Sequence, residues 1–262
     1  MSFDNKYFES EDVWDVNRVL GNAQELKRFT MTLDVIPESI NNLLDVGCGN
    51  GAFMYFVEQN TKPNKIQLNG LESSKVAIEN RVSKAEIVES DITKMPFKNS
   101  EYDVVSALEV LEHMSYQDLA KACSEMQRVS SKYILVSVPY KEKRVFATCP
   151  ECSCKFSPIY HLRSFDDDLL EGMFSEYKLV KKKYVTIESF YFAEYLRKAN
   201  YEYRIKWENE LVCPQCGYST DTCKDEKVSH IEINNPPLIE MVKKLIPKKK
   251  RPHWVICLYE RK

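Results

Sequence analysis

Three glycines lie within five residues of the sequence, directly after one short apolar run and directly before another. They are Gly47, Gly49 and Gly51, with Cys48 between the first two and Asp45 two residues ahead. Glycine lets a ligand approach the main chain closely, and a strand that turns into a helix here exposes N–H groups to a small polar ligand. The spacing G-x-G-x-G differs from the G-x-G-x-x-G of dinucleotide-binding turns, which argues against a nicotinamide cofactor.

Two later strands also end in carboxylates. A strand predicted over Ile66–Leu71 is followed by Glu72 and Ser73, and a strand over Glu86–Glu89 is followed shortly by Asp91 and Ile92. A strand-end Glu at this distance from the glycines can accept hydrogen bonds from both ribose hydroxyls of a nucleoside. An acid followed by an apolar residue suits an adenine. The plainer alternative is a pair of solvated strand ends.

The segment Asp45–Gly51 resembles the first motif of class I S-adenosylmethionine (SAM)-dependent methyltransferases. The phrase YDVVSALEVLEH, from Tyr102 to His113, resembles the fourth motif of small-molecule methyltransferases of the ubiquinone-biosynthesis type. The resemblance implies that SAM is the cofactor, that the backbone around Leu108 and Glu109 meets its methionine portion, and that His113 lies near the transferred methyl group. It also implies an α/β, Rossmann-like, mostly parallel seven-stranded sheet with helices on both faces.

The chain has nine cysteines, and four of them form two C-P-x-C pairs, Cys149 with Cys152 and Cys213 with Cys216. Each pair can turn two sulfurs toward one point, and four thiolates make a closed tetrahedral site for a structural Zn²⁺ ion. Free thiols in irregular loops are the alternative. Some further residues could replace a ligand or form a second site, namely Cys154, His161, Cys223 and His230.

Two histidines are candidates for a catalytic base, which a hydroxyl acceptor needs. His113 ends the fourth motif, and His161 follows the first cysteine pair at the rim where a substrate should lie. The alternatives are a packing role for His113 and a zinc-binding or surface role for His161.

Apolar periodicity and turn residues place these side chains on a simple series of elements. An N-terminal helix is predicted over Val16–Leu33, and Cys123 is assigned to the core face of a helix that begins at Ser115. The other predicted elements are a first strand over Asn42–Val46, a helix over Ala52–Gln59, strands over Tyr102–Leu108, Lys132–Val138 and Lys178–Ile187, and a closing strand over His253–Arg261, which the resemblance makes antiparallel.

This order predicts a SAM-binding core over residues 41–140, continued by 164–187 and 252–262. Residues 1–40 would form a helical lid, with Tyr7 and Trp14 as candidate lid side chains. Residues 141–163 and 188–251 would be zinc-bearing insertions that form a substrate cap. The basic run within residues 247–252, directly before the closing strand, is expected to be a solvated linker.

Composition limits the classes of partner. The 262 residues are 44% hydrophobic with a formal net charge of −2, which gives no overall attraction to nucleic acid or an anionic membrane. The N-terminus has no secretory pattern, so a cytoplasmic location is expected. We expect a SAM-dependent methyltransferase that acts on an oxygen or nitrogen of a small molecule, such as a saccharide or secondary metabolite, and that could form homo-oligomers. The alternatives are an RNA or protein methyltransferase that grips its substrate with the zinc insert, and a non-catalytic SAM-binding scaffold.

Overall fold

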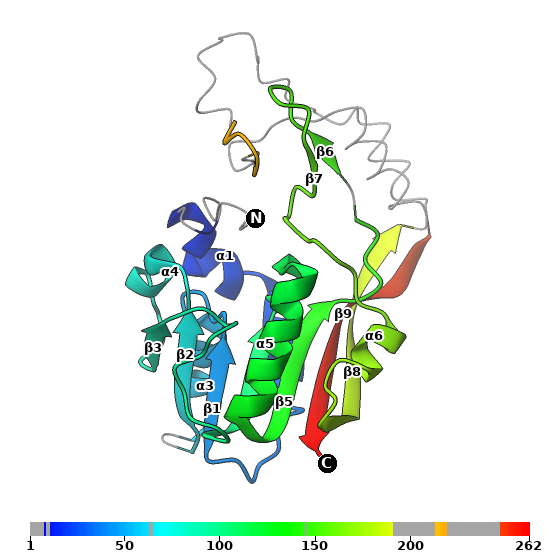
Figure 1. Ribbon diagram of the computed structural model, residues 1–262. Coiled ribbons are helices and arrows are strands. Elements are labelled where there is room, and N and C mark those ends of the chain that lie inside the picture. The colour runs from blue at the N-terminus through cyan, green and yellow to red at the C-terminus, as the bar shows by residue number, and fades with distance from the viewer. Residues whose placement is uncertain (1–7, 9–10, 63–64, 145, 191–212, 219–246) are drawn as a thin grey trace. The chain divides into compact units, whose positions relative to one another are not determined.

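The computed structural model describes residues 8, 11–62, 65–144, 146–190, 213–218 and 247–262, which are coloured in Figure 1. By contacts the chain divides into two compact units. The larger comprises residues 8–142, 161–185 and 252–262, and the smaller comprises residues 1–7, 143–160 and 186–251. Tyr7, Cys223 and His230 lie outside the described residues.

The larger unit is built on a seven-stranded sheet in the order β3-β2-β1-β4-β5-β9-β8. The pairs from β3 through β5 are parallel, whereas β9 runs antiparallel to β5. This confirms the predicted fold class, including the antiparallel closing strand. The strands are β1 (Asn42–Val46), β2 (Gln67–Glu72), β3 (Glu86–Glu89), β4 (Tyr102–Leu108), β5 (Ser130–Pro139), β8 (Tyr177–Phe190) and β9 (Lys248–Arg261).

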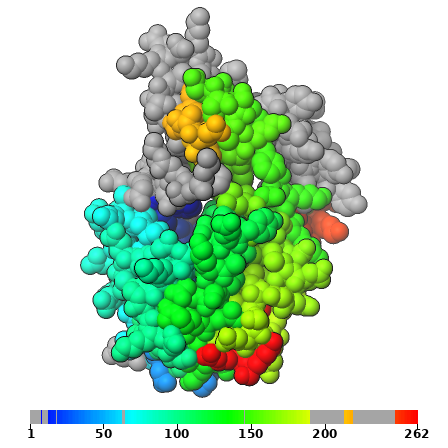
Figure 2. All heavy atoms as spheres, in the orientation of Figure 1, coloured from blue at the N-terminus to red at the C-terminus, as the bar shows by residue number. Residues whose placement is uncertain are grey.

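Helices cover both faces of this sheet. The chain moves from β1 to β2 in one direction along the sheet and from β4 to β5 in the other, and parallel crossovers are right-handed. The crossover helices α3 (Ala52–Asn60) and α5 (Tyr116–Val129) therefore lie on opposite faces (Figure 1). The outer face of α5 forms part of the molecular surface in Figure 2. The shorter helices are α4 (Lys75–Glu79), α6 (Asp167–Glu171) and the 3-10 turn η3 (Leu111–His113).

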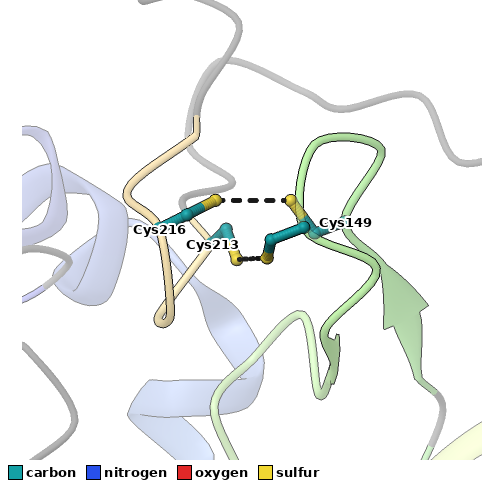
Figure 3. Close-up of side chains that lie close together, drawn as sticks. Cys149, Cys213 and Cys216 are labelled. Carbon is teal, nitrogen blue, oxygen red and sulfur yellow. Dashed lines mark hydrogen bonds between the residues drawn. The ribbon is translucent and has the colours of Figure 1, made fainter.

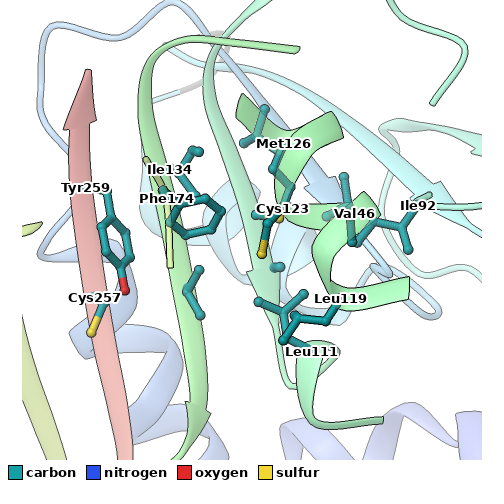
Figure 4. Close-up of a cluster of buried hydrophobic side chains, with 14 of the residues drawn as sticks. Val46, Ile92, Leu111, Leu119, Cys123, Met126, Ile134, Phe174, Cys257 and Tyr259 are labelled. Carbon is teal, nitrogen blue, oxygen red and sulfur yellow. The ribbon is translucent and has the colours of Figure 1, made fainter. Parts of the chain in front are cut away.

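The main core lies between α5 and the sheet (Figure 4). Ser115 caps α5 by accepting a hydrogen bond from the Asp118 N–H, and the apolar face of the helix is buried. Cys123 belongs to that face, as predicted, and is 7% exposed. Val46 and Ile92 join the same cluster, so the strands that carry the candidate cofactor residues are anchored by the core.

The N-terminal region differs from the single helix predicted over Val16–Leu33. The 3-10 turn η2 (Glu11–Trp14) and the helix α1 (Val16–Leu20) come first, and α2 (Ala23–Leu33) begins anew after Gly21. The side chain of Asn22 accepts hydrogen bonds from the first N–H groups of α2. The apolar periodicity continued through this cap, which is why the pattern suggested one helix.

The last strand starts earlier than the predicted His253. Residues 248–251, a basic run expected to be a solvated linker, form the first part of β9, and Lys248, Lys249 and Lys250 are exposed. In the smaller unit, β6 (Ala147–Thr148) and β7 (Lys155–Phe156) pair antiparallel around the first cysteine pair. No helix among the described residues is long and apolar enough to cross a membrane.

Candidate functional site

The glycine turn between β1 and α3 has the backbone geometry that only glycine adopts easily. Gly47, Gly49 and Gly51 all have positive φ, at 66°, 56° and 77°. A Cβ on Gly47 would lie 2.6 Å from a methyl group of Val110, and one on Gly49 would lie 2.4 Å from the ring of Trp14. The turn is therefore packed as well as bent, and side chains at these two positions would collide with their neighbours.

Glu72, at the end of β2, holds the turn in place. Its Oε2 accepts a hydrogen bond from the Gly49 N–H at 2.8 Å, and its Oε1 accepts from the N–H groups of Ser73 and Ser74 at 2.7 and 2.9 Å. The side chain is buried at 7% exposure. Because each carboxylate oxygen can accept two hydrogen bonds, Oε2 keeps capacity for one more donor, such as a sugar hydroxyl.

Asp45 is buried beneath the turn and contacts the next strand rather than the rim. Its Oδ1 accepts a hydrogen bond from the Ser106 hydroxyl at 2.7 Å. Burial raises the pKa of Asp45 to about 7, an effect that the Ser106 hydrogen bond and the charge of Arg28 only partly offset. Cys48 packs against β2, since its sulfur lies 2.6 Å from the point where a Cβ on Gly70 would stand. The Cys48 thiol is therefore directed toward β2, and Cys48 contributes only its backbone to the surface of the glycine turn.

The side chains of Asp91 and Ile92, which follow β3, lie in different environments. Asp91 is exposed, and its Oδ1 accepts hydrogen bonds from the N–H and hydroxyl of Thr93, both at 2.7 Å. Ile92 points into the core cluster and is 9% exposed (Figure 4). The carboxylate is thus presented to solvent beside a rigid, core-anchored backbone.

Leu108 ends β4, and Glu109 leaves the strand in a left-handed conformation with φ of 59°. The Glu109 carboxylate accepts hydrogen bonds from the Trp254 indole at 2.6 Å and the Ser137 hydroxyl at 3.1 Å. Burial raises its pKa to about 7, against the lowering effect of the Arg28 charge. Both oxygens of the Glu109 carboxylate therefore accept hydrogen bonds from residues of β5 and β9. Only the backbone of Glu109 remains for a ligand at this rim.

The two candidate histidines lie together, although they come from different segments. The rings of His113 and His161 meet edge to face with centroids 4.8 Å apart. The carboxylate of Glu112 lies close to both rings, with its Oε1 3.9 Å from His161 Nε2. On the other side of His161, Nδ1 lies 2.6 Å from Glu142 Oε2.

Several of these residues gave no sequence signal. The signal that could have identified Glu112 is its position directly before His113 in the fourth motif. Glu142 and Trp254 stand in segments without a motif, and Arg28 sits on an ordinary amphipathic helix. Only the folded chain brings them to the ends of β4 and β5.

In the smaller unit the four predicted cysteines converge (Figure 3). The sulfurs of Cys149 and Cys216 are 3.6 Å apart, as are those of Cys152 and Cys213. All four sulfurs lie within 4.8 Å of one another. A tetrahedral zinc ion with bonds of ~2.3 Å requires sulfurs ~3.8 Å apart, so the arrangement is compatible with a metal site.

Local backbone geometry forms this cluster. Gly217 has φ of 74°, and its N–H donates to the carbonyl of Cys213, which closes the second turn. Burial opposes ionisation of Cys213, but hydrogen bonds from the backbone N–H groups of Cys216 and Gln215 lower its pKa to about 7. Cys154 packs beside the cluster without joining it, and His161 belongs to the larger unit.

Comparisons with known proteins agree with this fold. Residues 44–132 match the family described as a methyltransferase domain. An uncharacterized protein of Methanocaldococcus jannaschii is 33% identical over 117 residues, which are 43% of this chain and 45% of that protein. The chain therefore matches less than half the length of this curated relative.

Two solved structures align over nearly the whole chain. A SAM-dependent methyltransferase of Archaeoglobus fulgidus has a TM-score of 0.52 at 16% identity and covers 94% of this chain and 97% of its own. Another, from Thermotoga maritima, has a TM-score of 0.50 at 16% identity and covers 99% and 97%. Residues 44–132 thus match a methyltransferase domain, and the chain has the fold of these two SAM-dependent methyltransferases.

Proposed function

We propose that this chain is a SAM-dependent methyltransferase that acts on an oxygen or nitrogen atom of a small-molecule acceptor. The observation that carries the proposal is the glycine turn fixed by Glu72 at the carboxyl ends of β1 and β2. The match of residues 44–132 to a methyltransferase domain supports it. Ligands of open parallel sheets bind at this edge.

The donor set at the rim fits the chemistry of SAM. The turn around Gly47 and Gly49 offers close backbone approach for the methionine portion, and Glu72 Oε2 has capacity for a ribose hydroxyl. Ser73 adjoins that carboxylate, and Asp91 presents an exposed acceptor suited to the amino group of adenine. The carbonyls and N–H groups around Leu108 and Glu109 complete the set.

Bound SAM supplies a methyl group that its sulfonium already activates for transfer. The residues of this chain must then hold the acceptor in line with that group and exclude water. In this proposal His113 and His161 stand on the acceptor side of the rim, where they touch the methyl-accepting group. Trp14, whose ring lies against Gly49, forms part of the N-terminal lid.

Isothermal titration calorimetry with SAM tests the cofactor assignment. We expect Gly49→Arg to abolish binding, because the new side chain would meet Trp14 and fill the turn. Gly172→Arg is the matched control, since Gly172 is exposed and a Cβ there meets nothing closer than 3.5 Å. Undiminished binding by Gly49→Arg, with the control also intact, would refute the assignment.

Acceptor class is tested by following S-adenosylhomocysteine production. Turnover with a fractionated metabolite extract, and not with total RNA or protein, is the expected result. A steep loss of acceptor binding with salt would instead favour nucleic acid. Tight SAM binding with no turnover on the metabolite extract, RNA or protein would instead favour a non-catalytic SAM-binding scaffold.

We further propose that Cys149, Cys152, Cys213 and Cys216 hold a structural Zn²⁺ ion, and that the zinc-bearing unit recognises the acceptor. Their converging sulfurs support the first part. Metal analysis should find one zinc bound by these sulfurs, lost in Cys213→Ser but kept in Cys154→Ser, whose thiol lies outside the cluster. An unchanged zinc content in Cys213→Ser would disprove the site.

A further inference from the structure

A second group of metal-binding side chains lies in the larger unit, at the end of β4. It consists of Glu112, His113 and His161, whose ligand atoms all lie within 4.8 Å of one another. One carboxylate and two imidazoles make a donor set that suits divalent ions such as Zn²⁺, Mn²⁺ and Fe²⁺. The group shares no residue with the four-cysteine cluster.

The buried carboxylate of Glu112 is the main reason to expect a cation at this group. The side chain is fully buried, and neither carboxylate oxygen has a hydrogen-bond partner among the described residues. Nε2 of His161 is 3.9 Å from Glu112 Oε1, which is too far for a hydrogen bond. A buried carboxylate without hydrogen bonds is costly, and a divalent ion placed between it and the two imidazoles would remove that cost.

His161 is already oriented for such an ion. Its Nδ1 lies 2.6 Å from Glu142, so the Nδ1–H donates to that carboxylate, and Nε2 is the ring nitrogen on the side of Glu112. A carboxylate behind a metal-binding histidine is the usual way in which proteins fix the tautomer and the ring.

The two segments that supply the ligands are also tied to each other. The Leu162 N–H donates to the Glu112 carbonyl at 2.7 Å, and the Arg163 guanidinium donates to the Met114 carbonyl. These two hydrogen bonds hold the segment around His161 against the segment that carries Glu112 and His113.

We propose that Glu112, His113 and His161 bind a catalytic divalent metal ion, with Glu142 as the positioning residue for His161. Three protein ligands leave coordination positions open for the acceptor. An acceptor hydroxyl on the metal would have a lowered pKa and would release its proton to solvent without a separate base. The resulting oxyanion would form the O–CH3 bond as the S–CH3 bond of SAM breaks, with S-adenosylhomocysteine as the leaving group. This last step rests on the proposed methyltransferase function and narrows the acceptor to a hydroxyl compound.

Metal binding is measured on the full-length zinc-loaded protein, without SAM or acceptor. Mn²⁺ is the probe because thiolates bind it weakly, and the electron paramagnetic resonance signal of free Mn²⁺ reports the bound fraction. We expect one Mn²⁺, or a second zinc equivalent, per wild-type chain. Binding should be lost in Glu112→Gln and His161→Ala but kept in His253→Ala, a matched histidine outside the cluster.

Glu142→Gln gives a test that does not depend on removing a ligand. It should weaken Mn²⁺ binding by roughly 10- to 100-fold and recover full occupancy at raised Mn²⁺. The proposal is overturned if the wild type binds neither Mn²⁺ nor a second zinc, or if His161→Ala binds as tightly as the wild type. Because SAM calorimetry is a separate measurement, loss of the metal site and loss of the cofactor assignment are distinguishable.

Discussion

Asp45→Asn should change how the stability of the protein depends on pH. Asp45 is 2% exposed, and burial raises its pKa from 3.8 to about 7. Between these values the folded protein keeps a proton on Asp45 that the unfolded chain has released. The stabilising contribution is therefore fully present below pH 3.8 and is lost as the pH rises toward 7.

The size of the effect follows from the pKa difference. Each pH unit in this window changes the free energy of unfolding by about 1.4 kcal/mol, so the wild type should lose about 2 kcal/mol relative to Asp45→Asn between pH 5 and pH 7. Above the folded pKa the difference should level off. Asn keeps an oxygen that can accept the Ser106 hydrogen bond but has no proton to release.

Urea denaturation of both proteins at pH 5, 6, 7 and 8, followed by circular dichroism, measures this difference. Asp103→Asn is the control on the neighbouring strand. Burial acts to raise the pKa of Asp103, but hydrogen bonds from Asn41 and Lys132 outweigh it and lower the pKa. That contribution is fully present above the ordinary value of 3.8 and is lost only at lower pH, so the control difference should be flat between pH 5 and pH 8. A flat difference for Asp45→Asn between pH 5 and 7 would refute the reasoning.

Three further changes test other parts of the structure. Glu72→Gln turns an amide toward the N–H groups of Gly49 and Ser73, and we expect SAM binding to weaken at least tenfold in calorimetry; unchanged affinity would contradict the role of this carboxylate. SAM should alter the fluorescence of Trp14, which lies against the glycine turn, and an identical spectral change in Trp14→Phe would exclude this residue as the reporter. Leu111→Ala should cost about 2–5 kcal/mol in the free energy of unfolding, since this side chain is completely buried next to Glu112 in the chain; a loss below about 1 kcal/mol would mean that the site collapses around the cavity.

Local patterns predicted the elements well where one residue type decides the backbone. The glycines at 47, 49 and 51 located the turn, and the bounds of β1, β3 and β4 agree with the predicted strands. The N-terminal helix was predicted wrongly because apolar spacing continues across Gly21 while the side chain of Asn22 starts a new helix. The basic run before His253 looked like a linker because exposed lysines give the same pattern in a loop and at the solvent-exposed start of a strand.

The direction of each side chain could not be predicted in the same way. For Glu109 the sequence predicts a cofactor contact through the backbone, and it gives no sign that the carboxylate turns toward Trp254, a residue near the end of the printed sequence. Ile92 was expected to face an adenine ring, whereas its side chain is part of the core. The proposed cofactor contacts at these positions rest on the backbone.

The sequence by itself determined the features that depend on neighbours along the chain: the glycine turn, the order of strands and helices, and the four paired cysteines. These follow from local φ preferences, hydrophobic period and ligand spacing. Only the tertiary structure decided which distant groups share a site. Glu112 is buried against His161, and His161 is held by Glu142, because β4 and β5 are adjacent parallel strands whose carboxyl ends meet at one edge of the sheet.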